Sequence, residues 1–215
     1  MRAVKRPVAA RRPKSRARKY VRHDERRRQI LDAAAELFAH RGFAGTTTRQ
    51  IAAAVGTTET VLFRHFPKKE SLYAAILEDR VPAASVDRWI THLKSLADRR
   101  EDEALFRAVA EAILESFRRD TIYHRLMMYA TLEGHELARI GQSKYSGPFL
   151  GFLRDYIARR QSQGAFKRMR PEWVVHVLVA TTSHYAQWTA LGQNVLGLSE
   201  AEVARQAVGL VLRLE

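Results

Sequence analysis

Several side chains able to contact a base edge or a phosphate occur close together between residues 47 and 69. Arg49 and Arg64 carry forked guanidinium groups, which bind guanine or a phosphate through two N–H donors. Thr60 can touch a thymine methyl group, and Glu59 can accept a hydrogen bond from cytosine N4. The alternative for Glu59 is a first-turn acid favoured by the helix dipole. We therefore interpret this segment as a surface for double-stranded DNA.

The start of this segment predicts a short helix. Thr47 and Gln50 fit a capping box, in which the hydroxyl accepts the amide three residues on and the amide side chain reaches back. The helix should end near Ala54 and bury Ile51. Thr48 and the free amides of the first turn would then be available to position a phosphate.

A second short helix should follow after a tight turn. Gly56 permits the left-handed backbone that such a turn needs. Thr58 can cap a helix over residues 59–65, although capping can also be its whole role, and Pro67 stops that helix. Two short helices at a sharp angle, the second with polar residues outside, are typical of a helix-turn-helix.

The residues before this motif predict one longer helix, from about residue 24 to residue 41. Its apolar side chains recur at i, i+4, i+7 and i+8 on one face. Gly42 supplies a C-terminal stop. The expected first domain is thus a three-helix DNA-binding unit over residues 23–67. The stripe consists of Ile30, Ala34, Leu37 and Phe38.

Residues 26–80 resemble the N-terminal region of the TetR family of transcriptional regulators. The resemblance implies an all-helical homodimer that binds a palindromic operator through this region. It also implies a larger helical ligand-binding and dimerisation domain over residues 68–215. The matching positions are Leu37-Phe38, Gly42, Thr46-Thr47, Ile51-Ala52, Gly56, Phe63, His65-Phe66, Lys69 and Leu72.

The resemblance also implies individual roles in DNA contact. His65 and Lys69 match family positions that contact DNA, with Lys69 at a helix start holding a phosphate. The alternative for His65 is a partly buried slot between helices. Phe63 stands where tyrosine is common, so a hydroxyl contact to phosphate is absent, and Thr60 replaces the usual glycine. Both departures make the operator sequence unpredictable.

The net charge of +14 is concentrated at the N-terminus. Residues 1–28 contain 13 of the 37 Lys and Arg but only 2 of the 23 Asp and Glu, which gives this segment +11. Residues 1–22 have few large apolar side chains, so we expect a disordered basic tail. It is either an arm that tracks phosphates or a solvated tail that raises non-specific affinity.

Composition and motifs argue against other classes of protein. With no cysteine there is no disulfide or thiolate metal site, and the cytoplasm is the expected compartment. No apolar run could span a membrane, and no phosphate loop, dinucleotide fingerprint or nucleophile elbow occurs. His176 and His184 lie eight apart, off-register on a helix, and make poor metal partners. We expect no enzyme activity, cofactor or metal.

Beyond residue 82 the sequence again predicts only helices, so the fold class is all-α. The last of these helices begins with a capping box formed by Ser199 and Glu202. We found no alternating strand pattern and no internal repeat. The expected helices span about residues 84–97, 102–119, 121–139, 145–163, 171–191 and 199–214.

Aromatic, methionine and histidine side chains in these helices are candidates for the lining of a ligand pocket. Methionine adapts to irregular ligands, and a pocket between helices needs an apolar lining with few polar groups. The alternative is ordinary core packing. The candidates are Trp89, Phe106, Tyr123, Met127, Met128, Trp173, His176 and Trp188.

The last two expected helices each carry an apolar stripe. In the family the corresponding pair meets its symmetry mate as a four-helix bundle, which implies a dimer interface here. Two half-sites on DNA also favour a dimer. The alternative is that both helices cap the core of one chain. The stripe residues are Val174, Leu178, Tyr185, Trp188, Val203, Ala207, Leu210, Val211 and Leu214.

The sequence thus predicts a regulator released from its operator by a small, apolar ligand, with double-stranded DNA and a second copy of the chain as partners. The competing hypothesis is a ligand-independent or architectural DNA-binding protein dominated by its basic tail. A ligand selective for one arrangement of the helices would bias the dimers able to span both half-sites.

Overall fold

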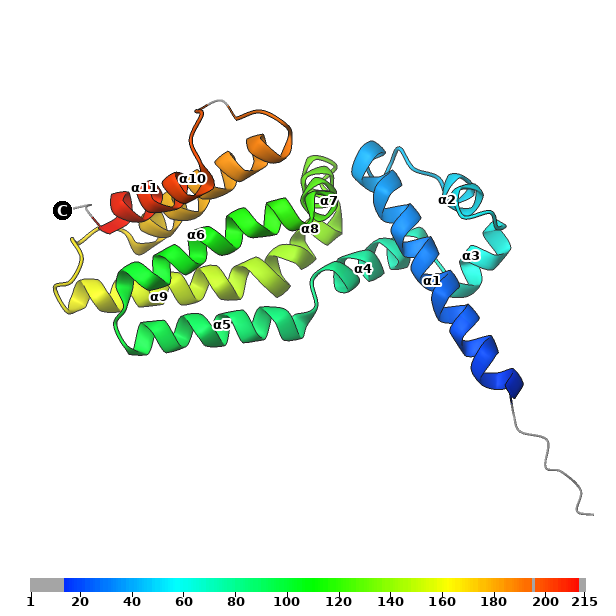
Figure 1. The fold of residues 1–215 in the computed structure, drawn as a ribbon, viewed down its shortest axis with the longest axis horizontal. Helices are drawn as coiled ribbons and strands as arrows, with labels where there is room; N and C mark the ends of the chain where they lie inside the picture. The colour runs from blue at the N-terminus through cyan, green and yellow to red at the C-terminus, as the bar shows by residue number, and fades with distance from the viewer. Residues whose placement is uncertain (1–13, 195, 213–215) are drawn as a thin grey trace, which may run out of the picture.

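The protein is built from helices, as the sequence predicts. The structure is a computed structural model that describes residues 14–194 and 196–212, and neither range contains a β-strand. No helix in these ranges is long and apolar enough to cross a bilayer. The elements, drawn in Figure 1, are α1 Lys14–Arg41, α2 Thr48–Ala54, α3 Glu59–His65, α4 Lys69–Arg80, α5 Ala83–Asp98, α6 Asp102–Arg119, α7 Thr121–Leu132, α8 Glu136–Gly141, the π-helical turn η1 Gln142–Ser146, α9 Gly147–Ser162, α10 Pro171–Ala190 and α11 Glu200–Leu212.

One hydrophobic core holds α1, α2, α3, α4 and α7 together, and we call this group the head. Phe38 of α1 and Tyr73 of α4 meet edge to face at 4.9 Å, both almost fully buried. Leu126 and Ala130 of α7 belong to the same core. Figure 1 shows α7 and α8 between α1 and the helices of the other core. α7 is therefore the element that joins the head to the rest of the chain by packing.

A second core is formed by α5, α6, α9, α10 and α11, which we call the body. α6 is central, since α5, α10 and α11 all pack on it. Leu105, Phe106 and Val109 of α6 are fully buried there. The apolar run of α10 is covered on several sides, which explains why it is apolar nearly all round.

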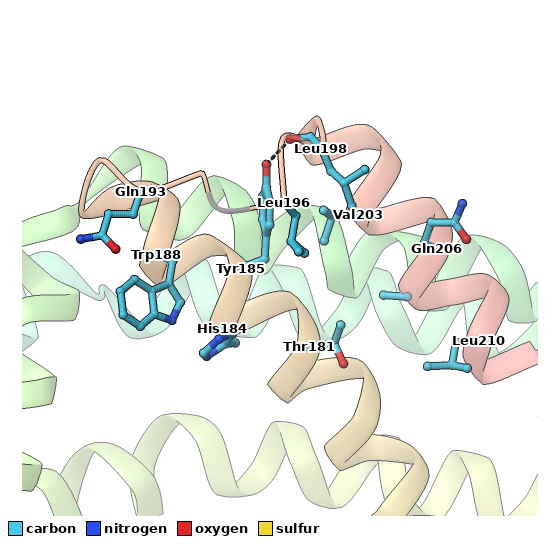
Figure 2. Close-up of a pocket in the computed structure, with 11 residues that line it drawn as sticks. Thr181, His184, Tyr185, Trp188, Gln193, Leu196, Leu198, Val203, Gln206 and Leu210 are labelled. Carbon is cyan, nitrogen blue, oxygen red and sulfur yellow. Dashed lines mark hydrogen bonds between the residues drawn. The ribbon is translucent and has the colours of Figure 1, made fainter.

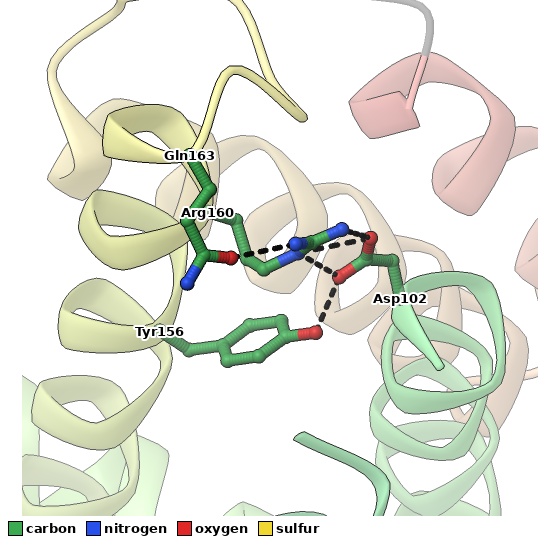
Figure 3. Close-up of polar contacts among 4 residues, drawn as sticks. All are labelled: Asp102, Tyr156, Arg160 and Gln163. Carbon is green, nitrogen blue, oxygen red and sulfur yellow. Dashed lines mark hydrogen bonds and ion pairs between the residues drawn. The ribbon is translucent and has the colours of Figure 1, made fainter. Parts of the chain in front are cut away.

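A polar cluster fastens the start of α6 to the end of α9 (Figure 3). The Arg160 guanidinium donates to both carboxylate oxygens of Asp102, with Nη2 2.7 Å from Oδ2. The Tyr156 hydroxyl donates to the same carboxylate, and Arg160 Nη1 donates to Gln163 at 2.7 Å. Two helices far apart in sequence are thus joined by a bidentate ion pair.

The expected disordered tail over residues 1–22 is wrong for residues 14–22. α1 begins at Lys14, about ten residues before the predicted start near Asp24. No proline follows Pro13 in this stretch, and lysine, arginine and alanine favour helices, so the helix extends through the basic residues. Residues 1–13 lie outside the described residues.

The other helices lie close to their predicted spans, with one break. The predicted helix 121–139 is wrong over residues 133–135, because Gly134 adopts a φ of +61° between α7 and α8. The expected domain boundary at residues 67–68 also does not coincide with the division between the two cores. Leu72 and Ile76 of α4 are buried in the head, as is Leu126 of α7.

Candidate functional site

α2 begins with the predicted capping box. The Thr47 hydroxyl accepts from the Gln50 amide at 3.2 Å, and the Gln50 side chain accepts from the Thr47 amide at 2.9 Å. Ile51 is fully buried. Arg49 lies on the opposite side of the helix and is exposed. The cap and the buried isoleucine together hold Arg49 at the solvent side of α2.

The turn and α3 also follow the prediction. Gly56 has a φ of +62°, the left-handed conformation that glycine tolerates best. Thr58 is the N-cap of α3, and its hydroxyl accepts from the Val61 amide at 3.4 Å. α3 ends at His65, two residues before Pro67. Two short helices are therefore joined by a tight turn, which is the geometry of a helix-turn-helix.

The exposed face of α3 carries three of the predicted contact residues. Thr60, Phe63 and Arg64 are all exposed, and their i, i+3, i+4 spacing places them on one face of the helix. The Phe63 side chain is 41% exposed, a high value for an aromatic ring. With Arg49 of α2, this surface offers two guanidinium groups, a hydroxyl and an apolar ring to a partner outside the chain.

Glu59 and Thr48 are occupied within the protein. The Thr48 hydroxyl donates to the Glu59 carboxylate across the two helices of the motif. This bond ties α2 to α3 and leaves part of the carboxylate free to accept from a further donor. Sequence reasoning predicted an outward role for each residue and missed the bond between them.

The Lys69 side chain, expected to hold a phosphate, is half-buried and contacts the loop after α1. Its ammonium group donates to the Phe43 carbonyl and lies 4.1 Å from the centre of the Phe43 ring. Burial lowers the pKa of Lys69, although the nearby carboxylate of Glu133 raises it. The aromatic ring and carbonyl of Phe43, between α1 and α2, hold the half-buried cation against the head.

The structure places His65 in a partly buried slot between helices, the alternative to its expected DNA contact. Its ring centre lies 4.3 Å from that of His23 in α1. Burial lowers the pKa of His65, and His23 and nearby arginines lower it further. The imidazole is therefore neutral at neutral pH, which removes the charge that would attract a phosphate.

One face of α7 holds the end of α1 and the loop after it. Arg125 Nε donates to the Ala39 carbonyl at 2.9 Å, and the Tyr129 hydroxyl donates to the His40 carbonyl at 3.2 Å. Both carbonyls belong to the last turn of α1, which a helix leaves without internal partners. α7 thus supplies the C-terminal cap of α1.

Glu133, at the C-cap of α7, continues this face to the loop. Its carboxylate accepts from the Phe43 amide at 3.0 Å and from the Ala44 amide at 3.2 Å. Gly42 has a φ of +72°, and a Cβ there would lie 2.2 Å from Glu133 Oε1. The loop that precedes the helix-turn-helix is therefore fixed by α7. No sequence signal indicated these contacts, because they join residues about 90 apart.

The ligand candidates do not all share one pocket. Trp89 and Tyr123 line a cavity of about 320 Å³ between the end of α4 and helices α5, α6, α7 and α9. Phe106 is buried in the body core, as the core-packing alternative has it. The cavity that contains Trp89 and Tyr123 is lined by Arg80, Val81, Pro82, Ser85, Val86, Trp89, Ala112, Ile113, Ser116, Arg119, Asp120, Tyr123, His124, Ser146 and Phe149.

The remaining ligand candidates lie elsewhere. Met127 packs against the head core, and Met128 is half-buried on α7. Trp173 is 55% exposed on α10, with its ring stacked on that of His176 at 5.5 Å. Trp188 faces a different groove. The sequence showed which side chains suit a pocket, but not which of them meet.

The cavity contains a polar corner. Arg80 Nη1 lies 2.6 Å from Asp120 Oδ1, and the same oxygen accepts from the Tyr123 amide at 3.0 Å as the N-cap of α7. The His124 ring stacks on Phe117 at 3.6 Å. Burial lowers the pKa of His124 to about 4, so this imidazole is neutral at neutral pH.

Most residues of the predicted dimer stripe are buried within one chain, so a second copy can meet only the exposed remainder of that stripe. α6 packs on both α10 and α11 and covers that stripe, as the core-capping alternative has it. Trp188 and Leu210 differ, being 38% and 49% exposed. Leu214 lies outside the described residues. The buried members are Val174, Leu178, Tyr185, Val203, Ala207 and Val211.

A groove of about 740 Å³ opens on the outer side of α10 and α11 (Figure 2). The Tyr185 hydroxyl donates to the Leu198 carbonyl at 2.5 Å and fastens the connecting loop to α10. The groove is lined by Thr181, His184, Tyr185, Trp188, Gln193, Leu196, Leu198, Val203, Gln206, Ala207 and Leu210. No group of three or more His, Asp or Glu able to hold a metal ion occurs among the described residues.

Comparison with known proteins agrees with this geometry. Residues 30–76 match the family described as "Bacterial regulatory proteins, tetR family". The chain is 30% identical to the HTH-type transcriptional regulator RutR of Escherichia coli K12 over 178 residues, which are 80% of this chain and 79% of RutR. It is 32% identical to the HTH-type transcriptional activator FasR of Mycolicibacterium smegmatis over 127 residues, 59% of this chain and 54% of FasR.

A solved structure shows the same fold. The crystal structure of AibR in complex with isovaleryl coenzyme A and operator DNA superposes with a TM-score of 0.66 at 20% sequence identity. The superposition covers 86% of this chain and 97% of AibR. The arrangement of head and body is therefore the one found in AibR.

Proposed function

Because the chain belongs to the TetR family of transcriptional regulators and is a DNA-binding protein, we propose that it is a homodimeric repressor that a small ligand releases from a palindromic operator. The observation that carries the proposal is the exposed surface formed by Arg49 of α2 and by Thr60, Phe63 and Arg64 of α3. FasR is an activator by name, so family membership does not fix the direction of regulation, and repression is part of the proposal.

The exposed surface suits the major groove of DNA. Arg49 and Arg64 bind guanine or phosphates, and Thr60 touches a thymine methyl group. The Thr47 hydroxyl, with the amides at the start of α2, positions a phosphate, whereas the Thr48 hydroxyl donates to Glu59 instead. In this proposal Arg49 and the exposed face of α3 contact bases, and the start of α2 contacts the phosphate backbone.

A second copy of the chain covers the groove on α10 and α11. Trp188 and Leu210 are exposed there, beside the apolar side chains of Leu196 and Leu198. A symmetric pair would place two heads on two half-sites about 34 Å apart or a multiple of that distance. Leu210→Lys should give a folded monomer in sedimentation, while Leu132→Lys, which alters an exposed leucine of α7, should remain dimeric.

The cavity at the end of α4 is the proposed effector site. It adjoins α7, whose other end holds the loop before the helix-turn-helix through Glu133. A ligand that alters the position of α7 changes the spacing of the two heads, and a repressor is then released. AibR, with isovaleryl coenzyme A and operator DNA in one crystal, is a protein of this fold that binds both kinds of partner.

The deciding experiment compares binding to the DNA upstream of the chain's own gene with binding to scrambled duplex, at physiological salt. We expect a preference of about a thousandfold or more. Equal binding with a steep salt dependence would contradict a specific operator and favour a general DNA-binding protein. Deleting residues 1–13, which contain five Lys and Arg, should weaken binding to both duplexes by the same factor. If the salt dependence of binding were unchanged by the deletion, the tail would have no part in DNA binding.

A further inference from the structure

The cavity at the end of α4 has an apolar wall and a basic rim. The wall includes the rings of Trp89 and Phe149, which contact each other with centres 4.7 Å apart. Val86 and Ile113 extend it along α5 and α6. A ligand with an aromatic or aliphatic part would bury that part against this wall.

The charged groups of the cavity do not balance. Arg80 and Asp120 neutralise each other at 2.6 Å, with side chains about one-fifth exposed. Arg119, at the end of α6, adds a cation that has no ion-pair partner among the described residues. His124 stays neutral at neutral pH, because burial lowers its pKa to about 4. The cavity therefore holds a net charge of about +1 at the point where α4, α6 and α7 meet.

We propose that this cavity selects a small monoanionic amphiphile, whose carboxylate binds Arg80 and Arg119 while its apolar part lies against Trp89 and Phe149. The inference rests on the proposed function and specifies the ligand class for that site. A guanidinium binds a carboxylate through two N–H donors, and the apolar wall favours ligands that have a hydrophobic part. A neutral ligand would gain no charge-assisted hydrogen bond from Arg119, which is exposed at the rim of the cavity.

The same site explains how such a ligand acts on α7. Asp120 Oδ1 accepts from both Arg80 at the end of α4 and the Tyr123 amide at the start of α7. A ligand carboxylate competes with Asp120 for Arg80 and replaces the bond that joins α4 to α7. The opposite end of α7 holds the loop before the helix-turn-helix through Glu133, so the exchange is transmitted along one helix.

The test is calorimetric titration of the full-length protein, without DNA, with 4-phenylbutyrate and with 4-phenyl-1-butanol. The acid should bind at least about tenfold more tightly than the alcohol, because only the acid gains charge-assisted hydrogen bonds. Arg80→Gln should remove this preference. Arg118→Gln removes an equal charge from an exposed neighbour of Arg119 outside the cavity, and should retain it.

Asp120→Asn gives a prediction of opposite sign. Asparagine still caps α7, but it frees Arg80, so binding of the acid should tighten severalfold. A merely structural role of the ion pair would weaken binding in both variants. Circular dichroism and thermal unfolding confirm that each variant is folded. Equal affinity for acid and alcohol, or no binding of either, would overturn the proposal.

Release of the operator is measured separately by fluorescence anisotropy of labelled operator DNA. If the acid binds but releases no DNA, the anion site stands and the proposed ligand-relieved repression fails. If another compound releases the operator while the acid does not bind, repression stands and the monoanion proposal is overturned. We expect the acid to bind and to release the operator, and we expect Arg80→Gln to bind the acid no more tightly than the alcohol and to stay on the operator.

Discussion

The Glu133 carboxylate accepts a hydrogen bond from the Phe43 amide at 3.0 Å, although 90 residues separate the two in sequence. Its second oxygen accepts from the Ala44 amide, and Gly42 beside it leaves no room for a side chain. The loop that leads into the helix-turn-helix therefore rests on the end of α7. The orientation of the DNA-binding surface depends on this contact as well as on the head core.

Replacing Glu133 by alanine should lower operator affinity more than stability. The two amides are near the surface and can bond to water, so the free energy of unfolding should fall by no more than about 1 kcal/mol. Operator affinity should fall by about fivefold, because the loop loses its fixed position. Anisotropy titration and urea unfolding measure the two effects. Glu136→Ala, an exposed glutamate of α8, is the control, and unchanged affinity in Glu133→Ala would contradict the role.

Arg49→Ala should remove most sequence-specific binding and leave the protein folded. Arg49 is exposed on α2, so its loss costs no packing, whereas a lost base or phosphate contact costs about 1–3 kcal/mol. Titrations against operator and scrambled duplex measure the specificity ratio, and sedimentation checks the oligomeric state. Arg118→Ala on α6 is the matched control. Retained operator selectivity would exclude Arg49 from recognition.

Arg160→Ala should destabilise the body by about 2–3 kcal/mol, because it leaves the Asp102 carboxylate largely buried without its cation. The matched control is Arg154→Ala on the same helix. Arg154 pairs with Asp155 at the surface, and such pairs contribute less than about 1 kcal/mol. Urea unfolding at neutral pH compares the two variants. Equal losses would show that the Asp102 pair contributes nothing particular.

His124 should make the protein less stable as the pH falls from about 6.5 to about 4. Burial lowers the pKa of the folded imidazole to about 4, so the unfolded chain takes up its proton first. The stability that neutral His124 contributes is fully present above pH 6.5. It falls with the pH, and the free energy of unfolding is lower by at most about 3 kcal/mol near pH 4. Unfolding at several pH values should show a shallower slope in His124→Gln. Parallel profiles for the two proteins would contradict the prediction, since other groups titrate equally in both.

The sequence by itself determined the local geometry of the helix-turn-helix. Thr47 with Gln50, Gly56 and Thr58 act on amides within a few residues, so the spacing of side chain and backbone is already present in the chain. The capping box at Ser199 formed for the same reason. The basic residues of α1 are the exception, since their charge indicated disorder although their helix propensity was favourable.

The tertiary structure alone decided which partner each of these helices meets. A period of 3.6 shows that a stripe on α10 or α11 is buried, but it does not show that α6, rather than a second chain, covers it. The same holds for Lys69, which bonds to Phe43, and for Glu133, which caps a loop 90 residues away. Such contacts depend on the packing of distant helices, whose combined geometry no local pattern contains.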